Sequence, residues 1–282
     1  MQATGNDFII CDWRHAQSTK GLAALSQQMA DRHFGVGADQ ILFVQNSSTC
    51  DVQMLVFNAD GSQAEMSGNG MRCFAKFLFD NQIVKKRNMT VETLAGVIRP
   101  EVVALDTDGK VSQVRVDMGP AQSYARIKLK SAHFTHWDKT ICSETADLAS
   151  DELWIHCVSM GNPHAVLFVR DVNAVPLEIW GPVIEQHPLF ANRTNFEVVA
   201  LNADQKLNQR TWERGAAETL ACGTGACAVV KTVIETQKMH SAYDVHLRGG
   251  VIAVEQDARG HMLQAGAVQL ICKGEFFTRV DF

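Results

Sequence analysis

Hydrophobic positions along the chain recur mostly with the two-residue period of β-strands, interrupted by a few stretches with helical spacing. β-Branched residues and turn-rich borders mark the strand-like runs. These runs cover residues 40–45, 52–57, 89–92, 111–118, 155–160, 165–169, 196–201, 244–247 and 264–272. The pattern predicts a protein built mainly from sheet.

Apolar residues at helical spacing predict three helices, over residues 22–33, 71–80 and 226–236. The first places Leu22 and Leu25 on one face with Met29, and it stops at Gly35, a typical helix terminator. The third carries five apolar residues at this spacing: Ala226, Val229, Val230, Val233 and Ile234. Few helices are therefore expected among many strands.

The last two helices begin alike, one after Ser67-Gly68-Asn69-Gly70 and the other after Cys222-Gly223-Thr224-Gly225. Other polar residues recur at the same separation in the sequence as Ser67 and Cys222, to within one residue. These pairs are Gly5-Asn6 with Gly161-Asn162, Gln40 with Asn195, and Asn58 with Glu213. Chance recurrence of turn residues is the alternative, since Gly and Asn are common in turns. The shared order favours a duplicated chain: two similar domains, with a small-molecule site between them.

The expected domain boundary falls near Met118-Gly119-Pro120, where a predicted strand ends in a turn signal. This gives an N-terminal domain of residues 1–119 plus about 268–282, and a C-terminal domain of residues 120–267. The polar stretch 135–151 is assigned to the second domain. Each domain then carries one glycine-rich helix start.

Composition narrows the class of protein. Of the 282 residues, 46% are hydrophobic and 20% charged, with a net charge of −5 and no massed Lys or Arg, which argues against a nucleic-acid partner. No apolar run reaches the roughly 18 residues of a membrane span, and the N-terminus lacks signal-peptide regions. A cytoplasmic protein is expected. Its eight cysteines form no Cys-x-x-Cys and no zinc spacing, so no metal site is expected.

The glycine-rich helix starts carry the candidate chemistry. Backbone N–H groups and the helix dipole make each start a site for an anion such as a substrate carboxylate. The same field is expected to lower the pKa of Cys222 toward neutrality, which makes it the candidate thiolate. Cys73 and Cys227 lie inside the helices and are interpreted as core residues.

Two facing half-sites suit chemistry at the α-carbon of an amino acid without an organic cofactor. Removal of the α-proton needs a base on one face, and inversion needs an acid on the other. His164 and Glu213 are candidates to tune the thiol, although a turn histidine and a surface ion pair with Arg214 are plain alternatives. A serine-hydrolase motif fails at Ser67 because Glu65 stands two residues before it, and no dinucleotide-binding motif follows a strand.

Eight ordered motifs resemble the diaminopimelate epimerase family along nearly the whole chain. They are Gly5-Asn6-Asp7-Phe8, Ala30-Asp31-Arg32-His33, Gly35-Val36-Gly37-Ala38-Asp39-Gln40, Phe57-Asn58-Ala59-Asp60-Gly61-Ser62, Gly68-Asn69-Gly70-Met71-Arg72-Cys73, Ser159-Met160-Gly161-Asn162-Pro163-His164, Glu213-Arg214-Gly215 and Ala221-Cys222-Gly223-Thr224-Gly225-Ala226-Cys227. The resemblance implies an α+β fold of two similar domains, each a β-barrel-like sheet around a central helix, with the active site in the cleft between them.

The resemblance also implies cofactor-independent interconversion of LL- and meso-diaminopimelate, in lysine and peptidoglycan precursor synthesis. It implies Cys222 as one catalytic cysteine and two pairs of carboxylate-binding amides, Gly68 with Asn69 and Gly223 with Thr224. The implied substrate contacts are Asn6, Gln40, Asn58, Asn162, Asn195, Glu213 and Arg214. Besides the amino-acid substrate, the one partner considered is a second copy of the chain, as a homodimer.

Ser67 departs from the family pattern, which has its other catalytic cysteine at this position. A hydroxyl is a far weaker acid than a thiol and a poor unassisted base near neutral pH. An engineered Cys→Ser replacement, a slow natural epimerase aided by water, and divergence toward one-base racemisation or elimination on another amino acid all remain open. So do a non-catalytic amino-acid-binding protein and an isomerase that uses Glu213 as its base.

Overall fold

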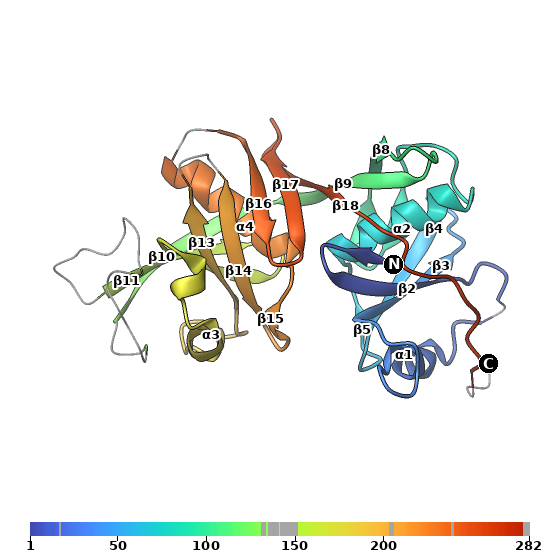
Figure 1. Ribbon diagram of the computed structural model, residues 1–282, viewed down its shortest axis with the longest axis horizontal. Coiled ribbons are helices and arrows are strands. Elements are labelled where there is room, and N and C mark those ends of the chain that lie inside the picture. Colours follow the sequence, from blue (N-terminus) through green and yellow to red (C-terminus); the bar gives the residue numbers. More distant parts are fainter. Residues whose placement is uncertain are drawn as a thin grey trace. The chain divides into compact units, whose positions relative to one another are not determined.

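The computed structural model describes residues 1–16, 18–130, 134, 141, 152–202, 206–237 and 240–278. The chain divides into two compact units, Met1–Asp117 with Ala265–Phe282, and Met118–Gln264. Strands β9 (Val111–Pro120) and β18 (His261–Ala267) carry the chain from one unit to the other (Figure 1). Of the polar stretch 135–151, all residues except Ile141 lie outside the described ranges.

The first unit has a sheet in the order β1-β2-β3-β4-β6-β7, with β5 paired to β4. β2 and β3 run parallel, whereas β3 and β4 run antiparallel. β8 pairs with β9. The bounds are β1 (Gln2–Ala3), β2 (Asn6–Asp12), α1 (Leu22–Ala30), β3 (Gln40–Gln45), β4 (Val52–Asn58), β5 (Gln63–Ala64), α2 (Gly68–Asp80), β6 (Val91–Thr93), β7 (Gly96–Ile98) and β8 (Glu101–Leu105).

The second unit has its strands in the order β10-β11-β12-β13-β14-β16-β17, with β15 paired to β14. Here β12 and β13 run parallel, and β13 and β14 run antiparallel. The bounds are β10 (Gln122–Lys130), β11 (Glu152–Ser159), β12 (Pro163–Phe168), the 3₁₀-helix η2 (Val172–Ala174), α3 (Leu177–Glu185), β13 (Asn195–Leu201), β14 (Leu207–Glu213), β15 (Ala217–Thr219), α4 (Gly223–Gln237), β16 (Ala242–Leu247) and β17 (Gly250–Gln256).

The two units repeat one topology with one register. Gln40 on β3 is paired with Phe8 on β2 and Asn58 on β4. In the second unit Asn195 on β13 is paired with His164 on β12, and β13 continues against β14 as β3 does against β4. Helices α1 and α3 occupy matching places in the chain, as do α2 and α4. The predicted α+β class with two similar domains is confirmed.

Each unit has a helix at the centre of its sheet. α2 packs against β1, β2, β3 and β8, and α4 packs against β11, β12, β13, β16 and β17. Both helices are apolar on several faces, as a helix enclosed by strands must be. The fully buried residues of α2 include Met71, Cys73, Phe74 and Leu78, and those of α4 include Ala226, Cys227, Val229, Val230 and Val233. The helix-core interpretation of Cys73 and Cys227 is therefore confirmed.

The structure differs from the predicted elements at their ends and in the number of strands. α2 and α4 begin at their glycines, three residues before the predicted starts, and the predicted helix 22–33 ends at Ala30. The predicted strand 264–272 ends at Ala267, and the sequence reasoning missed the strands β1, β2, β5, β7, β8, β10, β14, β15 and β17. It also missed α3, because Pro182 lies inside that helix and usually breaks one. None of the helices in the described ranges is long and apolar enough to cross a membrane.

Gly181 in α3 lies close against Trp212 of β14. A Cβ atom built there would stand 2.3 Å from Cδ2 of Trp212 on β14. The indole cannot move away freely because its Nε1 donates to Glu185 Oε2 at 2.7 Å. We expect Gly181→Ala to lower the free energy of unfolding by about 1–3 kcal/mol, measured by urea denaturation. Gly274→Ala, where nothing lies within 4 Å of the new Cβ, is the control. Equal stabilities of the two variants would contradict the prediction.

Candidate active site

Cys222 stands directly before α4, at the positive end of that helix. Its side chain is buried, with 4% of the residue exposed. Its Sγ lies 3.5 Å from Oγ1 of Thr224, in the first turn. The N–H groups of this turn have no partner within the helix itself. The arrangement places a thiol beside an anion-binding helix start.

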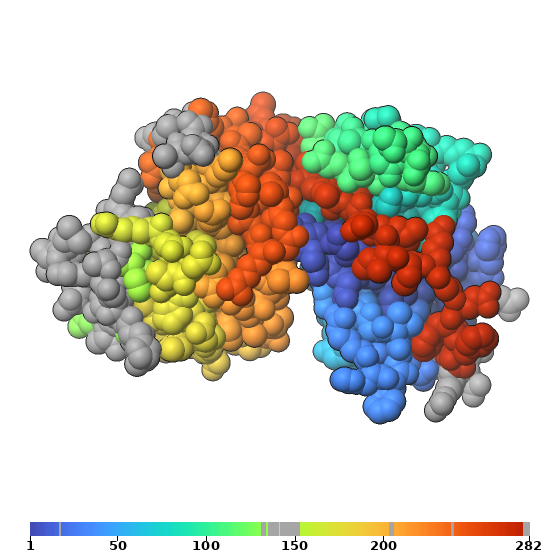
Figure 2. Space-filling model, viewed as in Figure 1, coloured from blue at the N-terminus to red at the C-terminus, as the bar shows by residue number. Residues whose placement is uncertain are grey.

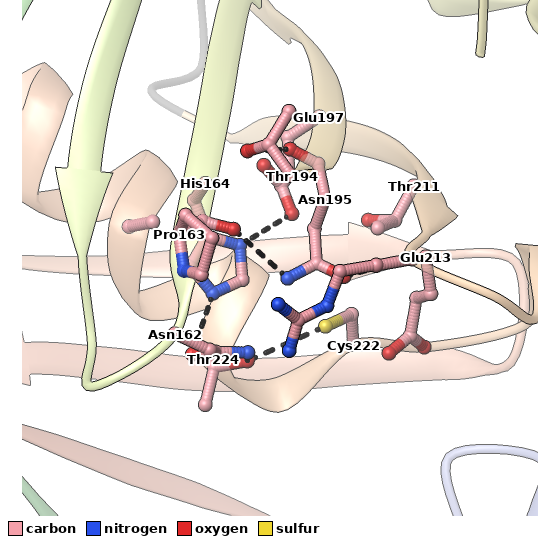
Figure 3. A network of polar contacts seen from close by, with 12 residues as sticks. Asn162, Pro163, His164, Thr194, Asn195, Glu197, Thr211, Glu213, Cys222 and Thr224 are labelled. Atoms are coloured by element: carbon pink, nitrogen blue, oxygen red, sulfur yellow. Dashed lines mark hydrogen bonds and ion pairs between the residues drawn. The ribbon is translucent and has the colours of Figure 1, made fainter. Parts of the chain in front are cut away.

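A continuous polar network leads from this thiol into the sheet (Figure 3). Asn162 Nδ2 donates to Thr224 Oγ1 at 3.4 Å, and Asn162 Oδ1 lies 3.1 Å from Nε2 of His164. His164 Nδ1 lies 2.7 Å from Oε1 of Glu197 on β13. Neither His164 nor Glu197 has any exposed area. His164 is therefore a buried residue paired with a carboxylate, and not a surface turn histidine.

Asn195, Glu213 and Arg214 meet at the ends of β13 and β14. Asn195 Nδ2 donates to the carbonyl of Pro163, and its Oδ1 accepts from the Arg214 backbone N–H at 2.9 Å. Glu213 Oε1 accepts from Thr219 Oγ1 at 2.6 Å. The exposed Arg214 side chain donates to the carbonyl of Asn192 at 2.9 Å and not to Glu213. The interpretation of Glu213 and Arg214 as a surface ion pair is wrong for this structure.

The prediction of a lowered thiol pKa is corrected. Burial raises the pKa of the Cys222 thiol well above its usual range, and the carboxylates of Glu213 and Glu197 raise it further. The hydrogen bonds from Thr224 and from Gly225 act in the opposite direction but are outweighed. The sequence showed the helix start but neither the depth of the thiol nor the two carboxylates around it. Without a bound ligand, burial and the two carboxylates favour the thiol form of Cys222 over the thiolate.

Ser67 occupies the matching position of the first unit. It is the N-cap of α2, with extended backbone (φ −139, ψ 118), and its Oγ accepts from the Gly70 N–H at 3.2 Å. Ser, unlike Cys, is among the preferred N-cap residues. A Cβ on Gly70 would stand 3.0 Å from Ser67 Oγ, so only glycine leaves that hydroxyl its room. Ser67 therefore has a structural role as the N-cap of α2, separate from any role in proton transfer.

The amides of the first unit form two groups. Asn69 Nδ2 donates to Asn6 Oδ1 at 3.3 Å, and Asn6 Nδ2 donates to Asp39 Oδ2. Separately, Gln40 Nε2 donates to Asn58 Oδ1 at 2.8 Å across β3 and β4. The structure thus brings together Asn6 with Asn69 and Gln40 with Asn58.

Sequence reasoning placed the second-unit candidates in one neighbourhood and missed one of its members. The network joins Asn162, His164, Thr224 and Cys222, and only Glu197 in it was not among the candidates. The available signal was an acidic residue inside the otherwise apolar strand Asn195–Leu201. Charged residues are almost never fully buried unless paired, so such a position indicates a buried partner.

Comparison with known proteins identifies the family of the chain. The diaminopimelate epimerase profile matches residues 1–124 and 156–271. The chain is 42% identical over 278 residues to the diaminopimelate epimerase of Desulforapulum autotrophicum, covering 97% of this chain and 96% of that one. It is 40% identical over 274 residues to that of Pelotomaculum thermopropionicum, covering 96% and 95%.

Among solved structures, a phenazine biosynthesis protein of the PhzF family from Enterococcus faecalis superposes with a TM-score of 0.69. The match covers 97% of this chain and 94% of that one at 13% identity, so it concerns the fold alone. The profile and the two epimerases, in contrast, extend along nearly the whole sequence. The chain belongs to the diaminopimelate epimerase family of isomerases.

Proposed function

We propose that this protein interconverts LL- and meso-diaminopimelate without an organic cofactor, with Cys222 as its competent acid–base group and Ser67 on the opposite face of the α-carbon. The observation that carries the proposal is the thiol of Cys222 at the start of α4, bonded to Thr224 and faced by Glu213. The family membership supplies the substrate. The two units act as two half-sites for one amino-acid centre.

The helix starts supply the electrostatics of the reaction. Loss of the α-proton leaves an electron pair that spreads onto the substrate carboxylate. Backbone N–H groups of Gly68 and Asn69 in one unit, and of Gly223 and Thr224 in the other, stabilise that growing negative charge. The base is the thiolate of Cys222, formed when the thiol gives its own proton to water, so the S–H bond of Cys222 forms again as the C–H bond breaks. Delivery of a proton from the other face then gives the inverted centre.

Substrate binding activates the thiol. Glu213 raises the pKa of Cys222 in the free protein, and an α-ammonium group beside Glu213 would offset that carboxylate charge. The pKa of the thiol then falls as the substrate enters, which couples deprotonation to binding. The amides of Asn6, Gln40, Asn58, Asn162 and Asn195, with the exposed Arg214 guanidinium, bind the polar groups of the substrate away from this centre.

The test is to incubate the protein with each diaminopimelate isomer in deuterated water. NMR follows the loss of the α-hydrogen, and chiral chromatography follows the stereochemistry. We expect conversion of each isomer toward the same mixture. For the isomer whose α-hydrogen faces Cys222, exchange should be faster than inversion, because Ser67 delivers the second proton slowly.

Three outcomes contradict parts of the proposal. Exchange with no inversion at long times would indicate one-base chemistry. Binding of both isomers by calorimetry with neither exchange nor conversion would indicate an amino-acid-binding protein. Exchange of another amino acid, and not of diaminopimelate, would overturn the substrate.

A further inference from the structure

The two units have the same strand topology, but the buried side chains near the starts of α2 and α4 differ. Four buried positions that match by strand register are apolar in the first unit and polar in the second. The first unit has Phe8, Leu42, Met54 and Val56 there, and the second has His164, Glu197, Gln209 and Thr211. None of these eight residues is more than 2% exposed.

This difference shows that the fold does not require a polar core. Burying a carboxylate and an imidazole costs free energy unless they are paired, and an apolar pair of similar volume is often no less stable. The first unit solves the same packing problem with Phe8 and Leu42. The polar set therefore needs an explanation other than folding, and it lies in the unit whose helix start holds the thiol.

Glu197 is the one carboxyl group of this set, and it is fully buried. A Cβ on Gly225, in the first turn of α4, would stand 2.6 Å from Glu197 Oε1 and 3.2 Å from Gln209 Nε2. The carboxyl group thus lies directly under the positive end of the helix, which stabilises its charged form. Burial raises the pKa of Glu197, while the charge and hydrogen bond of His164 lower it. Its Oε2 has no hydrogen-bond partner in the described part of the chain.

We infer that Glu197 is a positioning residue: through His164, Asn162 and Thr224, it directs a hydrogen bond onto the sulfur of Cys222. The inference rests on the proposed function only where it takes the sulfur of Cys222 to be the acid–base group. The network itself is present in the free protein (Figure 3).

The direction of each hydrogen bond follows from the pairing. Asn162 Oδ1 can only accept, so Nε2 of His164 carries a proton and donates to it, while Nδ1 bonds Oε1 of Glu197. The amide then presents Nδ2 to Thr224 Oγ1, as observed. The hydroxyl proton of Thr224 is left to donate to Cys222 Sγ, where it stabilises a thiolate.

Without the carboxylate the order reverses. A neutral imidazole with its proton on Nδ1 offers Nε2 as an acceptor. Asn162 then turns its NH₂ group toward that nitrogen, and its oxygen accepts the hydroxyl proton of Thr224. The sulfur of Cys222 loses its donor. Glu197 therefore favours the thiolate through the network although its own negative charge opposes it.

The hydrogen-bond network and the negative charge of Glu197 shift the pKa of Cys222 in opposite directions. The inference can therefore be tested without measuring turnover. Iodoacetamide alkylation of Cys222 is followed against pH in the parent, Glu197→Gln and Glu218→Gln. Glu218→Gln removes a carboxylate that pairs with Arg210 and Arg248 instead. Mass spectrometry quantifies the tryptic peptide 215–231, and fragment ions separate Cys222 from Cys227. The groups that act on the thiol are Glu213 from β14 and Glu197 from β13.

We expect Glu197→Gln to move the alkylation midpoint upward by about one pH unit, a tenfold loss of thiolate at a given pH, and Glu218→Gln to leave it unchanged. A downward shift would mean that Glu197 acts only through its charge, and no shift would mean that it does not act on the thiol. Either result overturns the inference. If the parent does not turn over diaminopimelate, the proposed function is refuted, but the alkylation test of Glu197 still applies.

Substitutions of Thr224 give a second, independent test of the same network. Thr224→Val should shift the midpoint as Glu197→Gln does, and the double variant should shift it no further, because both changes remove the same bond. Thr224→Ser should restore the parent profile. Additive shifts would overturn the route through Thr224. Glu197→Leu, which installs the residue of the matching position Leu42, keeps the test available if the amide variant folds poorly.

Discussion

Replacing Ser67 by Cys should raise the rate of diaminopimelate interconversion by roughly 10²–10⁴-fold, the range of a positioned acid–base group. A thiol has an ordinary pKa of about 8.5, and the start of α2 would lower it, since helix N-termini stabilise thiolates. A serine hydroxyl ionises far less readily at neutral pH. The second face of the α-carbon then gains a group that can both remove and return a proton, and inversion should catch up with exchange.

The same substitution should cost stability. Ser67 Oγ accepts the Gly70 N–H as the N-cap of α2, and loss of a good N-cap costs about 1 kcal/mol. Chiral chromatography measures the gain in rate and thermal unfolding measures the loss in stability. Ser18→Cys, at an exposed position of the same unit, controls for an added thiol. If Ser67→Cys leaves the rate unchanged while Cys222 stays reactive, Ser67 does not face the α-carbon.

The repeat of the two units was predictable from the sequence because the residues that mark it are needed for the conformation or close packing of the backbone. Gly5 and Gly161 have φ of 83° and 93°, in the left-handed region that glycine adopts without strain. Gly70 and Gly225 are required by close approach, since a Cβ on either would meet a side chain at 3.0 Å or less. Such positions stay recognisable in a sequence even when the surrounding core changes.

The polar core of the second unit could not be predicted in the same way. β14 has the sequence Leu-Asn-Gln-Arg-Thr-Trp-Glu, and its polar residues indicate a surface loop by composition. In the structure Gln209, Arg210 and Thr211 are buried. Arg210 satisfies its guanidinium with Glu218 and with the carbonyls of Val172 and Val175. Val172 and Val175 lie 38 and 35 residues from Arg210 in the sequence, and Glu218 lies 8 residues away, so no local pattern around Arg210 indicates them.

The pKa of Cys222 shows the same limit at the site. A helix start is a local feature and predicts a lowered thiol pKa. Burial and the carboxylates of Glu197 and Glu213 come from other strands and reverse that sign. The largest effect on the chemistry of one residue is thus set by tertiary contacts, while its position was set by local sequence.

Replacing Cys222 by Ala should abolish both exchange and inversion, by roughly 10⁴-fold or more, because it removes the one thiol that stands at the start of a helix in the described part of the chain. Substrate binding should persist, since Gly223 and Thr224 keep their backbone N–H groups. Calorimetry measures binding, and deuterium exchange measures catalysis. Cys227→Ala removes a buried thiol further along the same helix and should retain most of the rate.

Retained exchange in Cys222→Ala would indicate that Glu213 is the base, and Glu213→Gln should then remove the remaining activity. The double variant Ser67→Cys/Cys222→Ala gives the sharpest result. Among the helices that the structure describes, it has one thiol at a helix start, as the parent does, but in the other unit. Under the proposed function the two half-sites serve opposite faces of the α-carbon, so the isomer that exchanges rapidly should switch while inversion stays slow. Rapid exchange of the same isomer in both proteins would contradict the two-sided site.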